Sequence, residues 1–268
     1  MAQLNTSVSE LLEKMELSWH QITEIQTRIF KNAKDFCKMK KIIFKVSFLL
    51  LFMLSGTYSI AQDWANRDRY TPENTNLGEP ASGENRVVFM GNSIIEAWSQ
   101  FNPEFFTGKP YINRGISGQT TPQMLVRFRS DVLNLKPAVV VILGGTNDIA
   151  GNNGPTTLNM IMDNIISMAE LAKANNIKVV LASVLPTLDY PWRPGLNPAD
   201  KIAALNELIK EYARRSGIVY LDYYSAMVDN QRGLKTEYSY DGVHPNAAGY
   251  KVMAPLTEDA IAKALKQK

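Results

Sequence analysis

Short apolar runs that alternate with longer amphipathic stretches constrain the fold of this 268-residue chain most strongly. The short runs predict strands and the longer stretches predict helices. Strands that alternate with helices in this way indicate a mostly parallel sheet with helices on both faces and right-handed crossovers. We therefore expect an α/β fold, a three-layer α/β/α sandwich around a five-stranded sheet. The predicted strands are 86–90, 111–113, 138–143, 178–184 and 218–221, and the predicted helices are 94–99, 122–135, 158–175, 199–216 and 246–266.

Residues 39–61 have the features of a secretory signal peptide. Met39-Lys40-Lys41 opens a basic stretch, residues 46–54 are apolar apart from Ser47, and Ser59-Ile60-Ala61 supplies small residues around a candidate cleavage point. The apolar core is much shorter than the roughly 20 residues of a membrane-spanning helix, which leaves an uncleaved anchor as the weaker interpretation. We expect an exported protein, periplasmic or extracellular, without stable membrane insertion after cleavage.

Residues 1–38 fit poorly with this leader, because a cleavable signal peptide normally starts near the N-terminus. A helical pattern of apolar residues extends here from Leu12 to Ile29. Two interpretations remain open. Translation could begin at Met39, or residues 1–38 could form an amphipathic helix of unknown role.

The composition after the leader excludes several classes of function. The single cysteine, Cys37, lies upstream of the predicted cleavage, so the exported part has no disulfide and no thiol nucleophile. With only one histidine as well, a zinc site of the usual ligands is not expected. Acidic and basic residues are equal in number from Gln62 onward, and the basic residues form no stripe or cluster. Nucleic-acid binding is therefore not expected.

The domain itself is predicted to start near Arg86. Residues 62–85 are polar and contain two prolines and two glycines, so they are expected to form an irregular lead-in. The domain then occupies residues 86–268, a length that suits one full-sized core.

Three small polar blocks follow the first three predicted strands: Gly91-Asn-Ser93, Gly115-Ile-Ser-Gly118-Gln-Thr-Thr121 and Gly144-Gly-Thr-Asn147-Asp148. In a parallel α/β sheet, sites form at the carboxyl ends of strands. Each block also has an ordinary structural explanation. A serine or asparagine can cap a helix, and a glycine-rich segment can be a simple turn.

A fourth block, Asp241-Gly-Val-His244-Pro245, holds the only histidine downstream of the leader. An aspartate three residues before a histidine can orient the imidazole and stabilise its charged form, and the imidazole can accept the Ser93 proton. Alternatively, Asp241-Gly242 makes a turn and His244 is a surface residue. Four blocks in one order favour the catalytic interpretation over coincidence.

These four blocks resemble those of the SGNH hydrolases, also called the GDSL esterase/lipase superfamily, over nearly all of residues 86–265. The Gly-Ile-Ser-Gly-x-Thr-Thr pattern is similar to the branch of platelet-activating-factor acetylhydrolase catalytic subunits and lysophospholipase L1-like esterases. The resemblance implies a flavodoxin-like fold and a reaction that requires no cofactor or metal. It implies that Ser93 is the nucleophile, His244 the base and Asp241 its partner, with Gly118, Asn147 and the Ser93 amide as oxyanion hole.

One departure from the family is visible at position 92. The family usually has Gly-Asp-Ser, whereas this chain has Asn92 before Ser93. That aspartate is not the acid of the triad, so the implied mechanism is retained. The loss of a negative charge beside the nucleophile is expected to change the rate and the pH optimum.

Two aromatic segments bear on the substrate, and export, neutral charge and a short polar lead-in favour a soluble one. Tyr190 and Trp192, in an irregular insertion at 185–198, could stack on a sugar ring with Arg193 as a polar contact, or could simply pack the loop. Phe101, Phe105 and Phe106 are expected in the core rather than in an acyl pocket.

The predicted function is hydrolysis of short-chain or O-acetyl esters on carbohydrates. The alternative is hydrolysis of lysophospholipids or thioesters. A third possibility, from another class, is a glycan-binding protein that has kept an esterase fold without catalysis.

Overall fold

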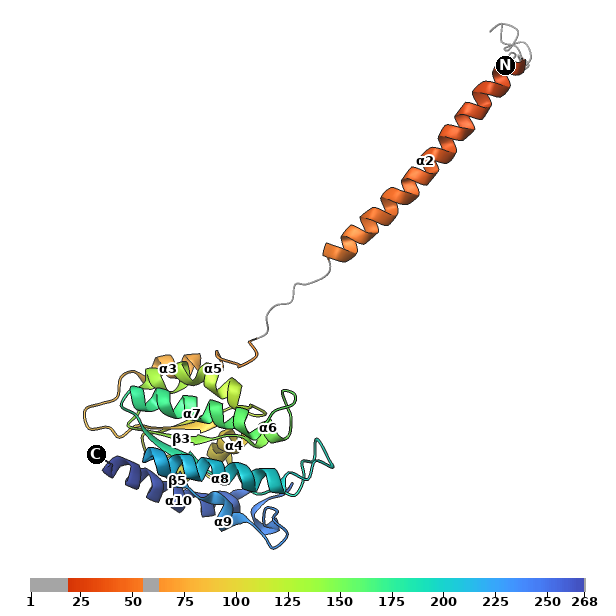
Figure 1. Ribbon diagram of the computed structural model, residues 1–268. Helices are drawn as coiled ribbons and strands as arrows, with labels where there is room; N and C mark the ends of the chain where they lie inside the picture. Colours follow the sequence, from red (N-terminus) through yellow and green to blue (C-terminus); the bar gives the residue numbers. More distant parts are fainter. Residues whose placement is uncertain (1–18, 55–62, 268) are drawn as a thin grey trace, which may run out of the picture. The chain divides into compact units, whose positions relative to one another are not determined.

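The computed structural model describes residues 19–54 and 63–267. Contacts divide the chain into two compact units, Met1–Gln62 and Asp63–Lys268. The described part of the first unit is one helix, α2 (Trp19–Leu54), which includes the start of the predicted leader (Figure 1). Within the described ranges, no helix is both long enough and apolar enough to cross a membrane. The predicted cleavage point at 59–61 lies outside these ranges.

The second unit is built on one parallel sheet with the strand order β2-β1-β3-β4-β5. In this order the chain adds a strand on one side of β1 and then continues on the other, which makes a switch point between β1 and β3. Open parallel sheets bind ligands beyond the carboxyl ends of the strands at such a point. The strands are β1 (Val87–Gly91), β2 (Tyr111–Gly115), β3 (Val139–Leu143), β4 (Lys178–Ala182) and β5 (Val219–Leu221).

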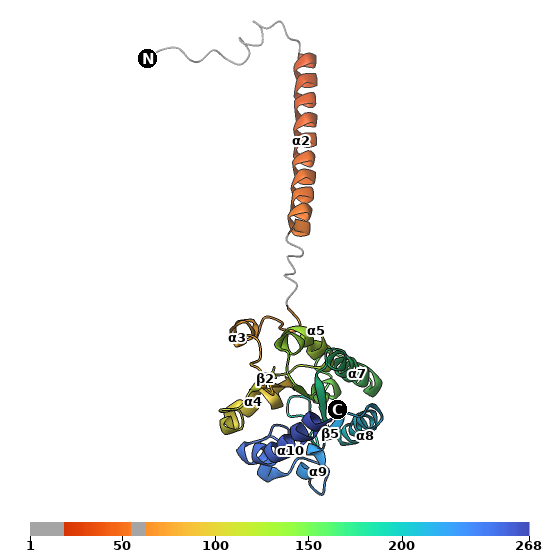
Figure 2. The same ribbon diagram turned by 90° about the vertical axis from the view of Figure 1, so that its left-hand side faces the viewer.

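Helices cover both faces of the sheet, as the alternating sequence pattern predicts (Figure 2). Successive side chains of a strand point to opposite faces, so Val88 and Met90 pack with one helix layer while Val87 and Phe89 pack with the other. The first layer contains α5 (Thr121–Asp131), α7 (Leu158–Ala174) and α8 (Ala199–Ser216), and the second contains α4 (Ser93–Phe101) and α10 (Ala247–Lys266). The predicted three-layer sandwich is confirmed.

Two of the three phenylalanines at 101, 105 and 106 belong to this core. Phe105 is buried and stacks against Trp98 with 4.5 Å between the ring centroids. Phe106 packs edge-on against Phe105, and the partly exposed Phe101 stacks on Tyr250. The prediction that these phenylalanines pack the core is confirmed for Phe105 and Phe106, whereas Phe101 is 39% exposed.

The lead-in differs from its prediction. Residues 71–77 form a helix, α3 (Thr71–Leu77), with a proline in its first turn. Asn74 of α3 donates hydrogen bonds to the Ser130 carbonyl and to the Asp131 carboxylate at the end of α5. The compact unit therefore starts at Asp63, upstream of the boundary expected near Arg86, because the lead-in is bonded to the sheet-and-helix core.

Two further short helices were not predicted. They are α6 (Thr146–Ile149), at the end of β3, and α9 (Tyr223–Met227), after β5. One or two helical turns are too short to show an apolar period in the sequence. Among the long helices, α8 has the predicted bounds, whereas the helix expected at 122–135 ends at Asp131 and is followed by a 3₁₀ turn at Leu133–Leu135.

Candidate active site

Ser93 is the first residue of α4, directly after the end of β1. The turn that leads to it requires glycine at position 91, because a Cβ atom there would lie 2.4 Å from a side-chain carbon of Ile95. Asn92 caps the helix: its side-chain oxygen accepts a hydrogen bond of 3.0 Å from the Ile94 amide. The tight turn and the cap together hold the half-buried Ser93 at the edge of the sheet where the strands end.

The departure at position 92 leaves this cap intact. The Asn92 side chain is fully buried, and its amide nitrogen has no hydrogen-bond partner among the described residues. An aspartate would place an acceptor oxygen there in place of a donor. The asparagine thus changes the charge behind the nucleophile but not the capping contact.

The histidine block forms a compact turn, which we call the His244 loop (residues 239–244). The chain reverses at Gly242, whose φ of 77° is in the left-handed region that glycine adopts without strain. The Asp241 Oδ1 atom accepts hydrogen bonds from the amides of Val243 (2.9 Å) and His244 (2.8 Å). Ser239 Oγ accepts from the Gly242 amide (3.0 Å) and donates to the His244 carbonyl oxygen (2.7 Å). Contacts over a few residues therefore orient both Asp241 and His244.

The side chains of Ser93, His244 and Asp241 form one continuous line of hydrogen bonds. The Ser93 Oγ atom lies 3.0 Å from His244 Nε2, and His244 Nδ1 lies 2.7 Å from Asp241 Oδ2. Partial burial alone would raise the pKa of Asp241, but the hydrogen bonds from the His244 amide, the His244 ring and the Val243 amide outweigh it, so the pKa is lowered. The carboxylate is thus ionised at neutral pH and can hold a proton on Nδ1, which leaves Nε2 free to accept the serine proton.

Gly118 and Asn147 lie beside one another, in the segment between β2 and α5 and in the first turn of α6. We call the former segment the Gly118 loop (residues 116–120), and Gly118 itself has a φ of 74°. The Asn147 amide nitrogen donates to the Gln119 carbonyl oxygen at 2.9 Å. Asn152 donates to Asn147 Oδ1 (3.1 Å) and to the Gly118 carbonyl oxygen (3.3 Å), so it fixes which end of the Asn147 amide is the donor.

The Gly118 loop is also joined to the nucleophile turn. The Ile116 amide donates to the Gly91 carbonyl oxygen at 3.1 Å, which continues the pairing of β1 with β2. Gly91 is also paired in register with the last residue of β3, three positions before α6 begins at Thr146. The carboxyl ends of β1, β2 and β3 thus bring three of the four predicted blocks together, and the hydrogen bond from Ser93 to His244 adds the fourth.

Asp148, next to Asn147, has a structural role. Its buried carboxylate accepts hydrogen bonds from the Thr121 amide (3.0 Å) and hydroxyl (2.6 Å) and so joins α6 to the start of α5. Burial raises the pKa of Asp148, although the two bonds from Thr121 oppose the shift. Among the described residues, no group of three or more histidine, cysteine or carboxylate side chains is placed to hold a metal ion.

The insertion at 185–198 supplies one candidate substrate contact in place of the three predicted. The prediction for Tyr190 is wrong, because its ring is completely buried and its hydroxyl is 3.0 Å from the Thr146 hydroxyl. Burial raises the pKa of Tyr190 to about 12. Arg193 is exposed, but its guanidinium donates to the carbonyl oxygens of Ala150 (2.7 Å) and Gly151 (2.8 Å) and so anchors the insertion.

Trp192 remains available. It is 43% exposed, and its ring centroid lies 6.0 Å from that of His244. Its indole nitrogen donates to Asn152 Oδ1 at 3.2 Å. Trp192 therefore lies next to the histidine and contacts the residue that orients Asn147.

Sequence analysis missed several residues that hold the site together. Ser239 and Asn152 act as polar braces, and nothing in their sequence neighbourhoods distinguishes them from surface residues. Gln119 lies inside a predicted block, but its contacts come from distant segments. Arg127 is fully buried on α5, and the only sequence signal for it is a charged residue on the face that the helical period predicts to be apolar.

Comparison with known proteins identifies the family and similar folds. The model of the GDSL-like lipase/acylhydrolase family matches residues 89–252. A solved structure of an inferred acylhydrolase from Bacteroides fragilis is 50% identical, with a TM-score of 0.75 over 76% of this chain and 100% of that one. A GDSL-like lipase from Bacteroides thetaiotaomicron is also 50% identical, with a TM-score of 0.73 over 75% and 98% of the two chains.

Curated relatives are more distant. The acetylxylan esterase of Xylanibacter ruminicola is 27% identical over 210 residues, which cover 66% of this chain and 43% of that protein. An uncharacterized lipoprotein of Bacillus subtilis is 32% identical over 81 residues, 29% of this chain and 33% of its own. The chain thus spans less than half the length of these two relatives. The family match over residues 89–252 shows that this chain belongs to the GDSL-like lipase/acylhydrolase family of carboxylic ester hydrolases.

Proposed function

We propose that the protein is an exported serine esterase that removes short acyl groups, above all acetyl groups, from carbohydrate esters. The observation that carries the catalytic part is the hydrogen-bonded line from Ser93 through His244 to Asp241, with distances of 3.0 and 2.7 Å. A serine hydroxyl is a weak nucleophile until a neighbouring base takes its proton. In this site the base, His244, is within hydrogen-bond distance of Ser93, and the carboxylate of Asp241 is within hydrogen-bond distance of His244.

Acylation follows from these positions. Ser93 Oγ attacks the ester carbonyl carbon while its proton passes to His244 Nε2, and the carbonyl oxygen becomes an oxyanion. The tetrahedral intermediate collapses, and the alcohol leaves with the proton from His244. Water then attacks the acyl-enzyme with His244 again as base, which releases the acid and restores Ser93. Asp241 stabilises the imidazolium in both steps, and no cofactor takes part.

The oxyanion is stabilised by three donors: the amides of Ser93 and Gly118 and the Asn147 side chain. An amide nitrogen carries two hydrogens. Within the described residues, Asn147 gives one of them to the Gln119 carbonyl, so the second remains for substrate. Donors that are fixed before the reaction stabilise a developing charge without reorganisation, which is usually the largest single contribution to catalysis.

The choice of a carbohydrate ester rests on Trp192 and on one relative. An exposed indole 6.0 Å from the histidine ring offers a flat apolar face for a sugar ring at the position of the leaving alcohol. A relative with 27% identity is named an acetylxylan esterase. Export is proposed from the leader pattern at 39–61.

The first test measures hydrolysis of p-nitrophenyl acetate, butyrate and octanoate by the wild-type protein and by Ser93→Ala. We expect activity that falls with chain length and disappears in the variant. A preference for octanoate would favour the lipid alternative. Binding of glycans without serine-dependent hydrolysis of any of the three esters would favour the non-catalytic alternative.

The second test separates the natural substrate classes. Acetate released from acetylated xylo-oligosaccharides is compared with fatty acid released from a lysophospholipid, at equal concentrations of enzyme. The proposal predicts a higher kcat/KM for the acetylated sugar. A higher value for the lysophospholipid would replace the proposed substrate but retain the serine esterase mechanism.

A further inference from the structure

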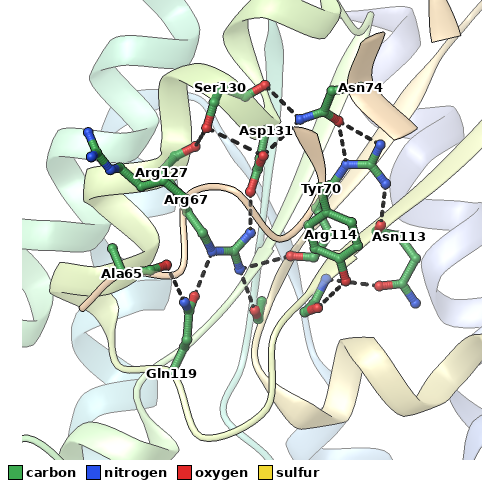
Figure 3. A network of polar contacts seen from close by, with 12 residues as sticks. Ala65, Arg67, Tyr70, Asn74, Asn113, Arg114, Gln119, Arg127, Ser130 and Asp131 are labelled. Carbon is green, nitrogen blue, oxygen red and sulfur yellow. Dashed lines mark hydrogen bonds and ion pairs between the residues drawn. The ribbon is translucent and has the colours of Figure 1, made fainter. Parts of the chain in front are cut away.

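A buried arginine, Arg127, is hydrogen-bonded to the ends of β1 and β2 and to the Gly118 loop. Arg127 of α5 is fully buried, and its guanidinium donates to the carbonyl oxygens of Gly91 (2.9 Å) and Arg114 (2.8 Å), at the ends of β1 and β2 (Figure 3). It also donates to the carboxylate of Asp131 (2.8 Å) and to Gln119 Oε1 (2.6 Å). Burial lowers the pKa of Arg127, and the bond to Asp131 opposes that shift.

Gln119 is the only one of these partners that lies in the Gly118 loop. It is 3% exposed, and each end of its side-chain amide has a partner. Its oxygen accepts from Arg127, and its nitrogen donates to the Ala65 carbonyl oxygen at 2.7 Å. Its own backbone carbonyl accepts from Asn147. Gln119 is therefore held both through its side chain and through its main-chain carbonyl, directly after Gly118 in the sequence.

The lead-in completes this arrangement from the outer side (Figure 3). The Tyr70 hydroxyl donates to the Gly115 carbonyl oxygen, at the start of the Gly118 loop. Asn74 accepts from Arg114 (2.7 Å) and donates to Asp131 (2.9 Å). It therefore connects Arg114 to the carboxylate that pairs with Arg127. Residues 65–74 are thus bonded to the loop and to its supports, even though they precede β1 in the sequence.

We propose that Gln119 is a positioning residue for the oxyanion hole, held between the buried guanidinium of Arg127 and the lead-in carbonyl of Ala65. Gln119 does not touch substrate. It acts through the orientation of the Gly118 amide and through the carbonyl that Asn147 uses to place its own amide. The inference rests on the proposed function and adds to it that the segment just after the predicted leader contributes to turnover.

The physical reason is the steep dependence of catalysis on geometry. An oxyanion donor is effective when it lies about 2.7–3.1 Å from the developing charge, and a displacement of about 1 Å can lower a rate roughly a hundredfold. A glycine loop has few side-chain contacts of its own to resist such a displacement. The two contacts of the Gln119 amide supply that restraint.

The test compares Gln119→Met and Gln119→Glu with wild type. Methionine keeps the length of the side chain and loses both hydrogen bonds. Glutamate keeps an acceptor for Arg127 and loses the donor to Ala65. The matched control is Lys136→Met, because Lys136 also donates to the lead-in, to the Glu79 carboxylate at 2.8 Å, but lies outside the Gly118 loop.

Active sites are first counted by titration with a fluorophosphonate that labels Ser93, and kcat on p-nitrophenyl acetate is then expressed per titrated site. We expect kcat per site to fall about ten- to a hundredfold in Gln119→Met and less in Gln119→Glu, with KM and the pH profile of kcat unchanged. Lys136→Met is expected to stay within about twofold of wild type.

A merely structural role gives a different result. It lowers the number of titrated sites and leaves kcat per site as in wild type, and that outcome in both Gln119 variants would overturn the inference. If kcat per site is normal in Gln119→Glu but lowered in Gln119→Met, the hydrogen bond to Ala65 does not contribute, and the lead-in has no part in positioning the loop. A wild-type protein that is neither titrated nor able to hydrolyse an ester would overturn the proposed function itself.

Discussion

The two halves of the candidate site are held in place in opposite ways. The His244 loop is shaped by hydrogen bonds within residues 239–244, so its geometry is nearly self-contained. The Gly118 loop depends on partners outside it: Arg127 of α5, and Ala65 and Asn147, which lie 54 and 28 residues from Gln119 in the sequence. The first half is therefore expected to tolerate changes elsewhere in the molecule, whereas the second should respond to substitutions far from the chemistry.

The largest expected effect tests whether the His244 loop carries the base. We predict that His244→Ala lowers kcat/KM about 10⁴- to 10⁶-fold, because no other described side chain hydrogen-bonds to Ser93 Oγ. The thermal unfolding midpoint should change little, since the imidazole is 34% exposed. Steady-state kinetics and a melting curve check both statements. Activity within tenfold of wild type would remove His244 from the mechanism.

The next effect concerns Asp241. Asp241→Asn keeps an oxygen that can accept from the Val243 and His244 amides, so the loop should keep its shape while the imidazole loses its charged partner. We predict a loss of about 10²- to 10⁴-fold in kcat. A wild-type rate in a correctly folded variant would show that the carboxylate only shapes the turn.

The same variant has a pH signature. Because the pKa of Asp241 is lowered in the folded protein, the stability that this carboxylate contributes is present above its unfolded pKa of about 3.9 and is lost as the pH falls through the folded value. The difference in free energy of unfolding between wild type and Asp241→Asn should therefore be largest near neutral pH and disappear in acid. Urea titrations at several pH values measure it. A difference that grows towards low pH would contradict the sign.

The half of the site that contains the Gly118 loop is tested at Asn147. Loss of an oxyanion donor in Asn147→Ala should lower kcat about a hundred- to a thousandfold. Asn152→Ala is expected to cost less, because it removes only the brace that orients the Asn147 amide. Equal losses in the two variants would indicate that orientation matters as much as the donor, and near-normal rates in Asn147→Ala would remove it from the site.

This contrast also explains what could be predicted from the sequence. The helix α8 was predicted with its observed bounds because its apolar period is long and a glycine follows its last residue. Ser93, Asp241 and His244 were predicted because the nucleophile and the base lie in short motifs whose geometry is local. The helices α6 and α9 were missed because one or two turns carry no period.

The remaining errors have a tertiary cause. The lead-in was predicted to be irregular from its prolines and glycines, yet Tyr70 and Asn74 have partners more than 40 residues away. Tyr190 was predicted as a stacking surface from its position in an insertion, but it is buried with its hydroxyl against Thr146. The sequence pattern and the amino-acid composition do not show whether a loop residue faces the core or the solvent.

The smallest predicted effect concerns Trp192, the contact between the insertion and both halves of the site. If its ring binds a sugar, Trp192→Ala should raise KM for an acetylated oligosaccharide about three- to tenfold and leave KM for p-nitrophenyl acetate unchanged, since aromatic stacking contributes about 0.5–1.5 kcal/mol. Trp192→Phe is the matched control, because it keeps a ring and loses the indole donor to Asn152. A normal KM in the phenylalanine variant would assign the effect to stacking. A fall in kcat on both substrates, in both variants, would instead assign Trp192 to the support of Asn152, and the insertion would then belong with the distant contacts that hold the Gly118 loop.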